Sequence, residues 1–474
     1  MKKIQNIVAG ILVVAASVVT AVPCTTTFAE VAESTTATQE VSIPTNRELA
    51  EQRKSEPVAS NEIKGWPKGP VIGAEGACLM DIDTGAILYN KNMDERLYPA
   101  SVTKIMTCLL AMEKSDMKEK VKFSAEAINA VPWDGCNMGM LPGEKLTMEQ
   151  CLNGILVHSA NEVANAVGEH ISGSMEAFAD LMNQRAKELG CKNTHFVNAN
   201  GLFDENHYTT AHDLALIGQQ FFQYEELCEM SSKHSFTVKK TNQRPEGFTV
   251  ASKNKFFNGQ FTYDHILGSK TGYTNESRQT LVTGAERDGR RLVCVILKEE
   301  SPAQFEDTIQ LLDYGFQNFK NVSIKEKGGY EELVEESVSD PKAEISYELE
   351  DEKACYTIPT TLKRGKVKAK YTLRKKVRKE EDDPEEESSG NVVYEQRKSL
   401  DGVVTYRYKG VLLGKAKVRG ESIVTVEPQE AQEVEAEPVE SVDAQKRRRD
   451  AVIVAGICLV LLVFLVHRKR KKTR

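Results

Sequence analysis

Three short motifs of chemically active side chains occur in one order along this 474-residue chain. The S-x-x-K motif at residues 101–104 pairs a hydroxyl with an amine. The S-x-N motif at 159–161 adds a hydroxyl and an amide, and the K-T-G motif at 270–272 adds a second amine. A serine hydroxyl is inert at neutral pH unless a base lies beside it, and a partly desolvated lysine can be that base. Each motif alone is weak, but the ordered set predicts acyl transfer through a serine nucleophile.

The first motif falls where an amphipathic helix is expected to begin. Pro99 precedes it, and apolar residues at helical spacing predict a helix over 101–114. The spacing of three positions puts the Lys104 amine on the same face as the Ser101 hydroxyl. A helix N-terminus also directs unpaired N–H groups at developing negative charge. Taken alone, the motif equally fits an N-cap serine beside a surface lysine.

The second motif lies between two helical patterns. We expect Ser159 to relay protons and Asn161 to hold a substrate amide or Lys104. The same residues fit a helix N-terminus, because Ser159 and Glu162 have the spacing of a capping box. Both interpretations can hold together, since capping would fix the loop that presents Asn161.

The third motif follows the apolar residues 266–268 and is expected on an edge strand that lines the site. Lys270 supplies positive charge, and Thr271 can donate a hydrogen bond to a carboxylate. Gly272 lets a substrate backbone approach, because it has no side chain. No metal or organic cofactor is predicted, since the cysteine spacing suggests neither zinc nor a redox pair.

Apolar patterns predict the elements that hold these motifs. Runs at 77–82 and 86–90 flank a turn and predict a β-hairpin. A period of two returns at 280–285 and 291–297, before an amphipathic helix at 304–319. Helical patterns lie between the two β regions, at 148–156, 162–171, 175–189 and 211–224. This order predicts an α/β fold in which an antiparallel sheet packs against a helical cluster.

The ends of the chain predict export and membrane attachment. Residues 1–29 have the features of a signal peptide cleaved after Ala29. A lipoprotein anchor at Cys24 is the alternative, but Pro23 stands where a small residue is needed. The apolar run 451–467 predicts a transmembrane helix that places the basic tail 468–474 in the cytoplasm and the body outside the cell. A helix lying on the membrane surface is disfavoured, because the run has no polar face.

Composition divides the remaining chain. Residues 30–70 are rich in Thr, Glu, Ser and Pro and predict a flexible leader, and the three motifs fall in a catalytic domain over 71–320. A small all-β domain is expected over 321–426, with strands at 343–349, 354–358, 366–373, 390–394, 403–408 and 411–416. Residues 427–450 combine an acidic, Pro-containing stalk with a basic flank.

Charge and cysteine content limit the function classes. The formal net charge is −7, and the basic clusters flank the expected membrane helix, so nucleic-acid binding has no support. Two of the ten cysteines, Cys24 and Cys458, lie in the signal peptide and the membrane helix. Export favours disulfides among the others, whereas apolar surroundings fit free buried thiols equally well, and both interpretations stay open.

Longer segments around the motifs resemble the low-molecular-weight D-alanyl-D-alanine carboxypeptidases, penicillin-binding proteins of a serine peptidase family that trims peptidoglycan. The resemblance is carried by residues 98–107, 198–202, 207–215 and 268–274 and covers about residues 72–320. It implies a β-lactamase/transpeptidase-like catalytic domain. It also implies peptidoglycan stem peptides as substrates and β-lactam antibiotics as covalent inhibitors.

The resemblance further implies the roles of individual residues. Ser101 is the acylated nucleophile and Lys104 its base, and the backbone amides of Ser101 and Tyr273 form the oxyanion hole. The implied catalytic residues are Ser101, Lys104, Ser159 and Asn161. The implied substrate-binding residues are Lys270, Thr271, Gly272 and Tyr273.

Two departures from the family pattern matter. Gln304 takes the place where the group often has an arginine for the terminal carboxylate, so carboxylate affinity would depend on Lys298. The group also usually ends in an amphipathic helix on the membrane, where this chain has a predicted span. The expected function is that of a D-Ala-D-Ala carboxypeptidase. The alternatives are a β-lactamase-like hydrolase, disfavoured by S-A-N in place of S-D-N, and a catalytically silent penicillin- or wall-binding module.

Overall fold

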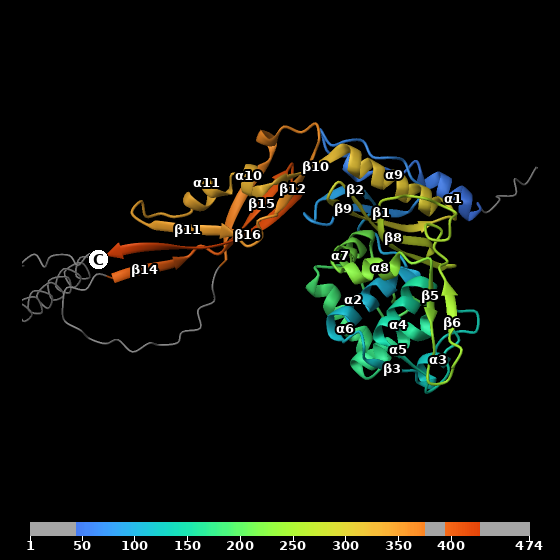
Figure 1. Cartoon of the computed structure of the whole chain (residues 1–474). Coiled ribbons are helices and arrows are strands. Elements are labelled where there is room, and N and C mark those ends of the chain that lie inside the picture. Colours follow the sequence, from blue (N-terminus) through green and yellow to red (C-terminus); the bar gives the residue numbers. More distant parts are fainter. Residues whose placement is uncertain (1–43, 375–393, 427–474) are drawn as a thin grey trace, which may run out of the picture. The chain divides into compact units, whose positions relative to one another are not determined.

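The computed structural model describes residues 44–374 and 394–426. A five-stranded antiparallel sheet in the order β2-β1-β9-β8-β7 organises the first part of this chain (Figure 1). Its strands are β1 (Gly76–Asp81), β2 (Ile87–Lys91), β7 (Ile266–Thr274), β8 (Arg278–Arg287) and β9 (Arg290–Glu299). The predicted hairpin and the predicted late strands are therefore neighbours in one sheet, with β7 at its edge.

Both faces of this sheet are buried, because side chains of the central strands alternate between two cores. On β1, Cys78 and Met80 belong to the core beneath the helical cluster, whereas Ala77 and Leu79 belong to the opposite core. Helix α9 (Ala303–Asn318) covers this second face (Figure 1). The helical cluster on the first face contains α2 (Lys104–Lys114), α4 (Met148–Asn153), α5 (Asn161–Ser172), α6 (Met175–Glu188), α7 (Ala211–Phe221) and α8 (Glu225–Ser231). The predicted α/β arrangement is confirmed.

Several short elements do not follow from the apolar patterns. They are β3 (Lys120–Lys122), α3 (Ala125–Asn129), β4 (Lys145–Thr147), β5 (Ser235–Val238) and β6 (Phe248–Ala251). β3 pairs with β4 and β5 with β6 in two-stranded sheets. Strands this short carry too few residues for a period of two to stand out.

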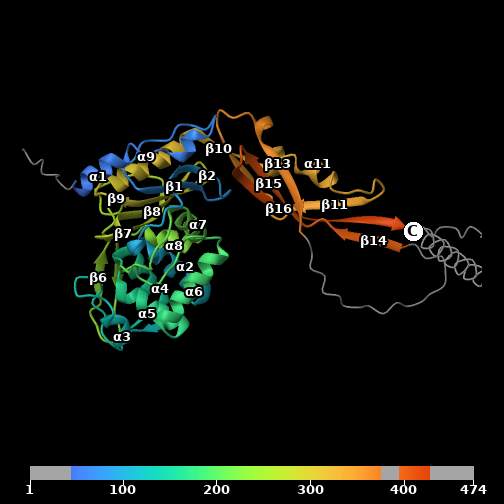
Figure 2. The same cartoon turned by 180° about the vertical axis from the view of Figure 1, so that it is seen from behind.

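A second β domain follows α9 (Figure 2). β10 (Phe319–Ser323) pairs with β12 (Cys355–Pro359). The larger sheet has the order β11-β16-β15-β13, with β14 also paired to β16. Its strands are β11 (Glu344–Leu349), β13 (Lys368–Leu373), β14 (Tyr394–Ser399), β15 (Gly402–Tyr408) and β16 (Val411–Val426). The domain is not all-β, because it includes the short helices α10 (Ile324–Lys327) and α11 (Tyr330–Glu335). Of the strand predicted at 390–394, residues 390–393 lie outside the described residues, and Tyr394 belongs to β14.

The segment expected to be a flexible leader contains ordered structure from residue 44 onward. α1 (Asn46–Arg53) is followed by a 3-10 turn (Ala59–Glu62). The Arg53 side chain donates hydrogen bonds to the carbonyls of Gly73 at 2.8 Å and Lys298 at 3.0 Å. The indole N–H of Trp66 donates to the carbonyl of Leu88 at 2.9 Å. Hydrogen bonds hold this segment against the rest of the protein in place of an apolar stripe. Composition therefore gave no sign that the segment is ordered.

The eight cysteines of the described residues are free thiols, which decides between the two interpretations of the sequence in that part of the chain. Within residues 44–374 and 394–426, no helix has the length and apolar character to cross a membrane. The predicted signal peptide, stalk, membrane helix and basic tail lie outside the described residues.

Candidate active site

Ser101 and Lys104 are brought together by the helical start that their spacing predicts. Ser101 lies in a 3-10 turn (Ala100–Thr103), and α2 itself begins at Lys104. Nζ of Lys104 lies 2.9 Å from Oγ of Ser101. The interpretation as a surface lysine beside an N-cap serine is wrong, since Lys104 is 0% exposed.

The Lys104 amine has two further neighbours that accept hydrogen bonds from it. One is Oδ1 of Asn161 at 2.7 Å, and the other is the backbone carbonyl of Asn200. Burial holds the pKa of Lys104 well below its usual range, and the positive charge of Lys270 lowers it further. A neutral amine has two N–H groups and one lone pair. If the N–H groups serve Asn161 and Asn200, the lone pair is left to accept the Ser101 proton.

The second motif is presented by a backbone that the sequence does not reveal. A π-helix (Gly154–His158) ends at Ser159, whose φ of 63° is left-handed, and α5 starts after Ala160. Such a conformation in a residue with a side chain costs of order 1–3 kcal/mol and is typical of functional sites. The capping-box interpretation is wrong, because Ala160 is the N-cap residue. The Glu162 carboxylate instead accepts a hydrogen bond from the Met138 amide at 2.6 Å.

Lys270 joins the second motif to the third. It lies on the edge strand β7, as predicted, and is 3% exposed. Its Nζ donates to Oγ of Ser159 at 3.0 Å and to the carbonyl of Thr271 at 2.7 Å. Burial lowers the pKa of Lys270 to about 8.

Gly272 also lets two segments of the chain itself come close together. A Cβ there would lie 2.8 Å from the Ser101 amide nitrogen and 2.4 Å from Oγ1 of Thr280. The missing side chain therefore lets β7 press against the turn that carries Ser101. Thr280 strengthens this junction by donating to the carbonyl of Pro99 at 2.8 Å.

The residues 198–202 form the loop that delivers the Asn200 carbonyl. Gly201 has a φ of +82°, and a Cβ there would lie 1.9 Å from the Ala100 carbonyl oxygen. Ala100 itself has a left-handed φ of 50°. Ala100 and the loop around Gly201, both with left-handed backbone, thus meet next to Ser101. The loop supplies the Asn200 carbonyl that faces Lys104.

His207 holds the 3-10 turn that carries Ser101 through a hydrogen bond to Thr103. The amide of Val197 donates to its Nδ1 at 3.1 Å, so Nε2 carries the proton and donates to Oγ1 of Thr103 at 2.8 Å. Burial lowers the pKa of His207 to about 3, which keeps the ring neutral. His207 therefore positions the 3-10 turn, a role that its sequence context does not show.

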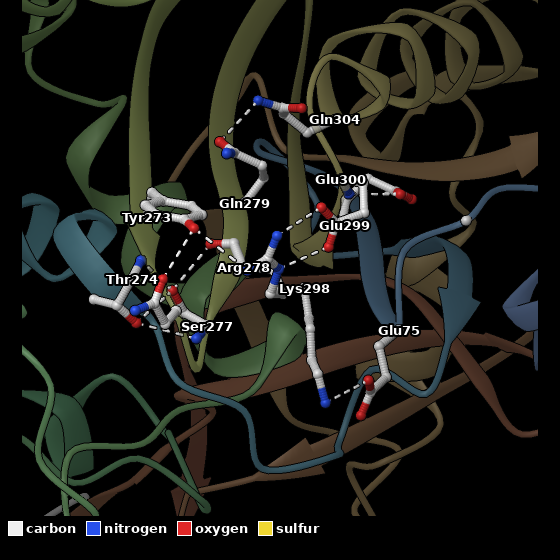
Figure 3. Close-up of polar contacts among 12 residues, drawn as sticks. Glu75, Tyr273, Thr274, Ser277, Arg278, Gln279, Lys298, Glu299, Glu300 and Gln304 are labelled. Atoms are coloured by element: carbon white, nitrogen blue, oxygen red, sulfur yellow. Dashed lines mark hydrogen bonds and ion pairs between the residues drawn. The ribbon is translucent and has the colours of Figure 1, made fainter. Parts of the chain in front are cut away.

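Gln304 and Lys298 both have polar partners within the protein. Gln304 is 2% exposed, and its amide nitrogen donates to Oε1 of Gln279 at 3.1 Å (Figure 3). The Lys298 ammonium forms an ion pair with Glu75 at 2.7 Å (Figure 3). The expectation that Gln304 takes the place of a carboxylate-binding arginine therefore stays a prediction.

The second cation near Lys270 is Lys253, which the sequence analysis missed. Lys253 is exposed, and its positive charge contributes to the lowered pKa of Lys270. Its Nζ lies 3.1 Å from Sγ of Cys136. Lys253 follows β6, far from the three motifs in sequence, and no motif spacing identifies it.

Comparisons with known proteins agree with this geometry. A family model described as D-alanyl-D-alanine carboxypeptidase matches residues 64–301. The chain is 34% identical to D-alanyl-D-alanine carboxypeptidase DacF of Bacillus subtilis over 59% of its own length and 74% of that protein. It is 31% identical to DacA of Haemophilus influenzae over 67% and 80% of the two chains. The structure of penicillin binding protein 5 from Haemophilus influenzae matches with a TM-score of 0.55 and 26% identity, covering 75% of this chain and 98% of that one.

Proposed function

Because this chain belongs to the D-alanyl-D-alanine carboxypeptidase family, we propose that Ser101 is the residue acylated in its reaction. The protein is a serine-type D-Ala-D-Ala carboxypeptidase, a penicillin-binding protein. The observation that carries the assignment of Ser101 is the contact of 2.9 Å between its hydroxyl and the buried Lys104 amine. No other hydroxyl accepts a hydrogen bond from Lys104 within the described residues.

Lys104 is the general base of the proposed acylation. Its neutral amine takes the Ser101 proton while Oγ forms a bond to the carbonyl carbon between the two D-alanines. The carbonyl oxygen becomes negatively charged and is held by the backbone amides of Ser101 and Tyr273. Collapse of this intermediate breaks the peptide bond and leaves an ester on Ser101.

Ser159 relays the proton that the leaving amine needs. Its hydroxyl lies 3.0 Å from the Lys270 ammonium, whose charge supports proton transfer toward the departing D-alanine. Asn161 keeps Lys104 oriented throughout. Water then attacks the ester, with Lys104 again as base, and releases the shortened peptide.

Lys270 and Thr271 bind the terminal carboxylate of the substrate. Thr271 donates a hydrogen bond, and Lys270 contributes charge from a buried position, where electrostatic attraction is stronger than in water. Lys253 adds a second positive charge near Lys270. This assignment accounts for carboxylate binding without an arginine.

The substrate class and the location follow from the family and from the sequence. Peptidoglycan stem pentapeptides are the proposed substrates, and β-lactams the proposed acylating inhibitors. The signal peptide and the apolar run 451–467 support a single-pass membrane protein with its catalytic domain outside the cell.

Mass spectrometry tests the nucleophile directly. Incubation with a fluorescent penicillin and digestion should give one labelled peptide, which contains Ser101. The Ser101→Ala variant should neither release D-alanine from a pentapeptide nor become labelled, and labelling that survives this change would contradict the assignment.

A further inference from the structure

A groove of about 1260 Å³ on the second β domain has a strongly cationic lining. We call it the basic groove. Every charged residue of its lining is basic and exposed, and no acidic residue takes part. These residues are Lys64, Lys366, Lys368, Lys370, Arg407 and Lys409. Such a concentration of one sign is unexpected in a chain with a net charge of −7.

The strand register concentrates this charge on one face of the sheet. Lys368 and Lys370 on β13 point to the same side, because they are two residues apart in a strand. Lys368 lies directly opposite Arg407 of β15 in the antiparallel register. Like charges in directly opposite positions destabilise a sheet. The arrangement thus costs stability in the absence of an anion.

Among the described residues, the groove cations have no acidic partners, whereas neighbouring cations of the same sheet do. Within residues 44–374 and 394–426, none of the six forms an ion pair, and Arg407 donates to the carbonyl of Gly410 at 2.8 Å. On β16, Lys417 and Arg419 both pair with Glu350. Within the described residues, a carboxylate therefore neutralises the cations beside the groove, whereas the cations inside it can bind an external anion.

The groove wall is held in place without a ligand. The Tyr408 hydroxyl donates to the Lys64 carbonyl at 2.9 Å, and Tyr408 is 6% exposed. The Lys409 ammonium lies 5.7 Å from the centroid of the Tyr408 ring. These contacts fix the backbone at both ends of the lining, so that binding would require little reorganisation.

We propose that the basic groove binds a linear polyanion built from phosphodiester groups. Alternate residues of a strand recur about every 7 Å, which suits a polymer with regularly repeated charges. Five of the six cations are lysines, which bind phosphate as point charges, whereas planar carboxylates are matched best by arginine. No large exposed apolar side chain lines the groove. The groove therefore lacks an apolar surface that could insert into a membrane.

Binding of a fluorescently labelled poly(glycerol phosphate) to the full-length chain tests this proposal. The variant K366E/K368E/K370E should bind at least ~10-fold more weakly, because attraction at three positions becomes repulsion. The matched control K114E/K118E/K187E makes the same charge change at exposed lysines of the catalytic domain and should stay within about 2-fold of the parent. Unchanged hydrolysis of a soluble pentapeptide shows that the catalytic domain of the groove variant is folded, and thermal unfolding like that of the parent shows the same for its second β domain.

Four results would overturn the proposal. Equal losses in both triple variants would show that total charge decides, and no loss in the groove variant would place the site elsewhere. A groove variant that loses binding to phosphatidylglycerol vesicles, while still binding the polymer, would assign the groove to a membrane. The polymer could also bind only after the acidic residues 380–387 are deleted. This result would show that the basic groove of the intact chain does not bind an external polymer.

Discussion

Nζ of Lys270 lies 3.0 Å from Oγ of Ser159, so the third motif reaches the second through a single hydrogen bond. Lys104 and Lys270 are both buried amines, and the charge of Lys270 lowers the pKa of Lys104. One amine can thus remain neutral as a base while the other stays charged as a binding group. This division of roles between two lysines determines how activity should depend on pH.

We expect a bell-shaped dependence of kcat/KM on pH. Activity should fall at low pH, because Lys104 must be neutral to accept the Ser101 proton. It should also fall as the pH rises through about 8, the pKa of Lys270, because the neutral amine no longer attracts the carboxylate. In the variant K270R the alkaline fall should disappear from the range below pH 10, since arginine stays charged. An unchanged alkaline limb in K270R would assign it to another group.

The substitution Lys104→Ala should slow acylation by at least ~10²-fold, the usual scale for the loss of a general base. Stopped-flow measurement with a fluorescent penicillin would give this rate. The loss of the amine also leaves Oδ1 of Asn161 and the carbonyl of Asn200 without their partner. A drop in Tm should accompany the kinetic effect. A rate within a few-fold of the parent would indicate that Ser159 acts without Lys104.

Ser159→Gly should separate stability from activity. Glycine adopts the left-handed φ of 63° without steric cost, so S159G should be more stable than S159A, by about 1 kcal/mol. Both variants lose the hydroxyl that contacts Lys270, and both should lose activity to a similar degree. Thermal unfolding and D-alanine release measure the two effects. Full activity in either variant would exclude a proton relay through Ser159.

Gln304→Arg should destabilise the protein and should not improve turnover of acidic substrates. The side chain is 2% exposed, and a guanidinium in its place would lose its hydration, which costs several kcal/mol. The matched variant Gln304→Met keeps the volume without a charge and should fold normally. A gain in kcat/KM restricted to substrates with a free C-terminal carboxylate would mean that this side chain does reach the substrate.

Deletion of residues 451–474 should yield an active enzyme that no longer sediments with membranes. These residues follow the catalytic domain and the second β domain in the sequence. Sedimentation after a salt wash, together with D-alanine release, would check this. Continued sedimentation of the shortened chain would indicate a second anchor, such as an uncleaved signal peptide.

The sequence predicts those parts of the site that depend on residue type and short spacing. Ser101 and Lys104 are three residues apart in a helical start, so their contact follows from helix geometry. The Asn200 carbonyl cannot be predicted in this way, because every residue has a carbonyl and only the loop around Gly201 directs this one. Lys253 and His207 come from segments whose approach depends on tertiary packing.

In the fold, too, some elements could be predicted from the sequence and others could not. Long amphipathic helices and buried strands are predicted correctly, because their periods extend over many residues. The helix α1 is missed, since hydrogen bonds from Arg53 and not an apolar stripe hold it. The orientation of Gln304, the second residue of α9, could not be predicted for a related reason, because the sequence carries no signal for the side on which its amide lies.

The position of β7 at the edge of the sheet has a consequence for self-association. An edge strand offers backbone donors and acceptors that another copy of the chain could pair with, and natural proteins often prevent such pairing with an inward-pointing lysine. Lys270 is a lysine in the middle of this strand. Two copies paired along β7 would bring their two Lys270 amines close together in a buried environment, where like charges repel strongly. The charge that we propose to attract a carboxylate would therefore also discourage aggregation along β7.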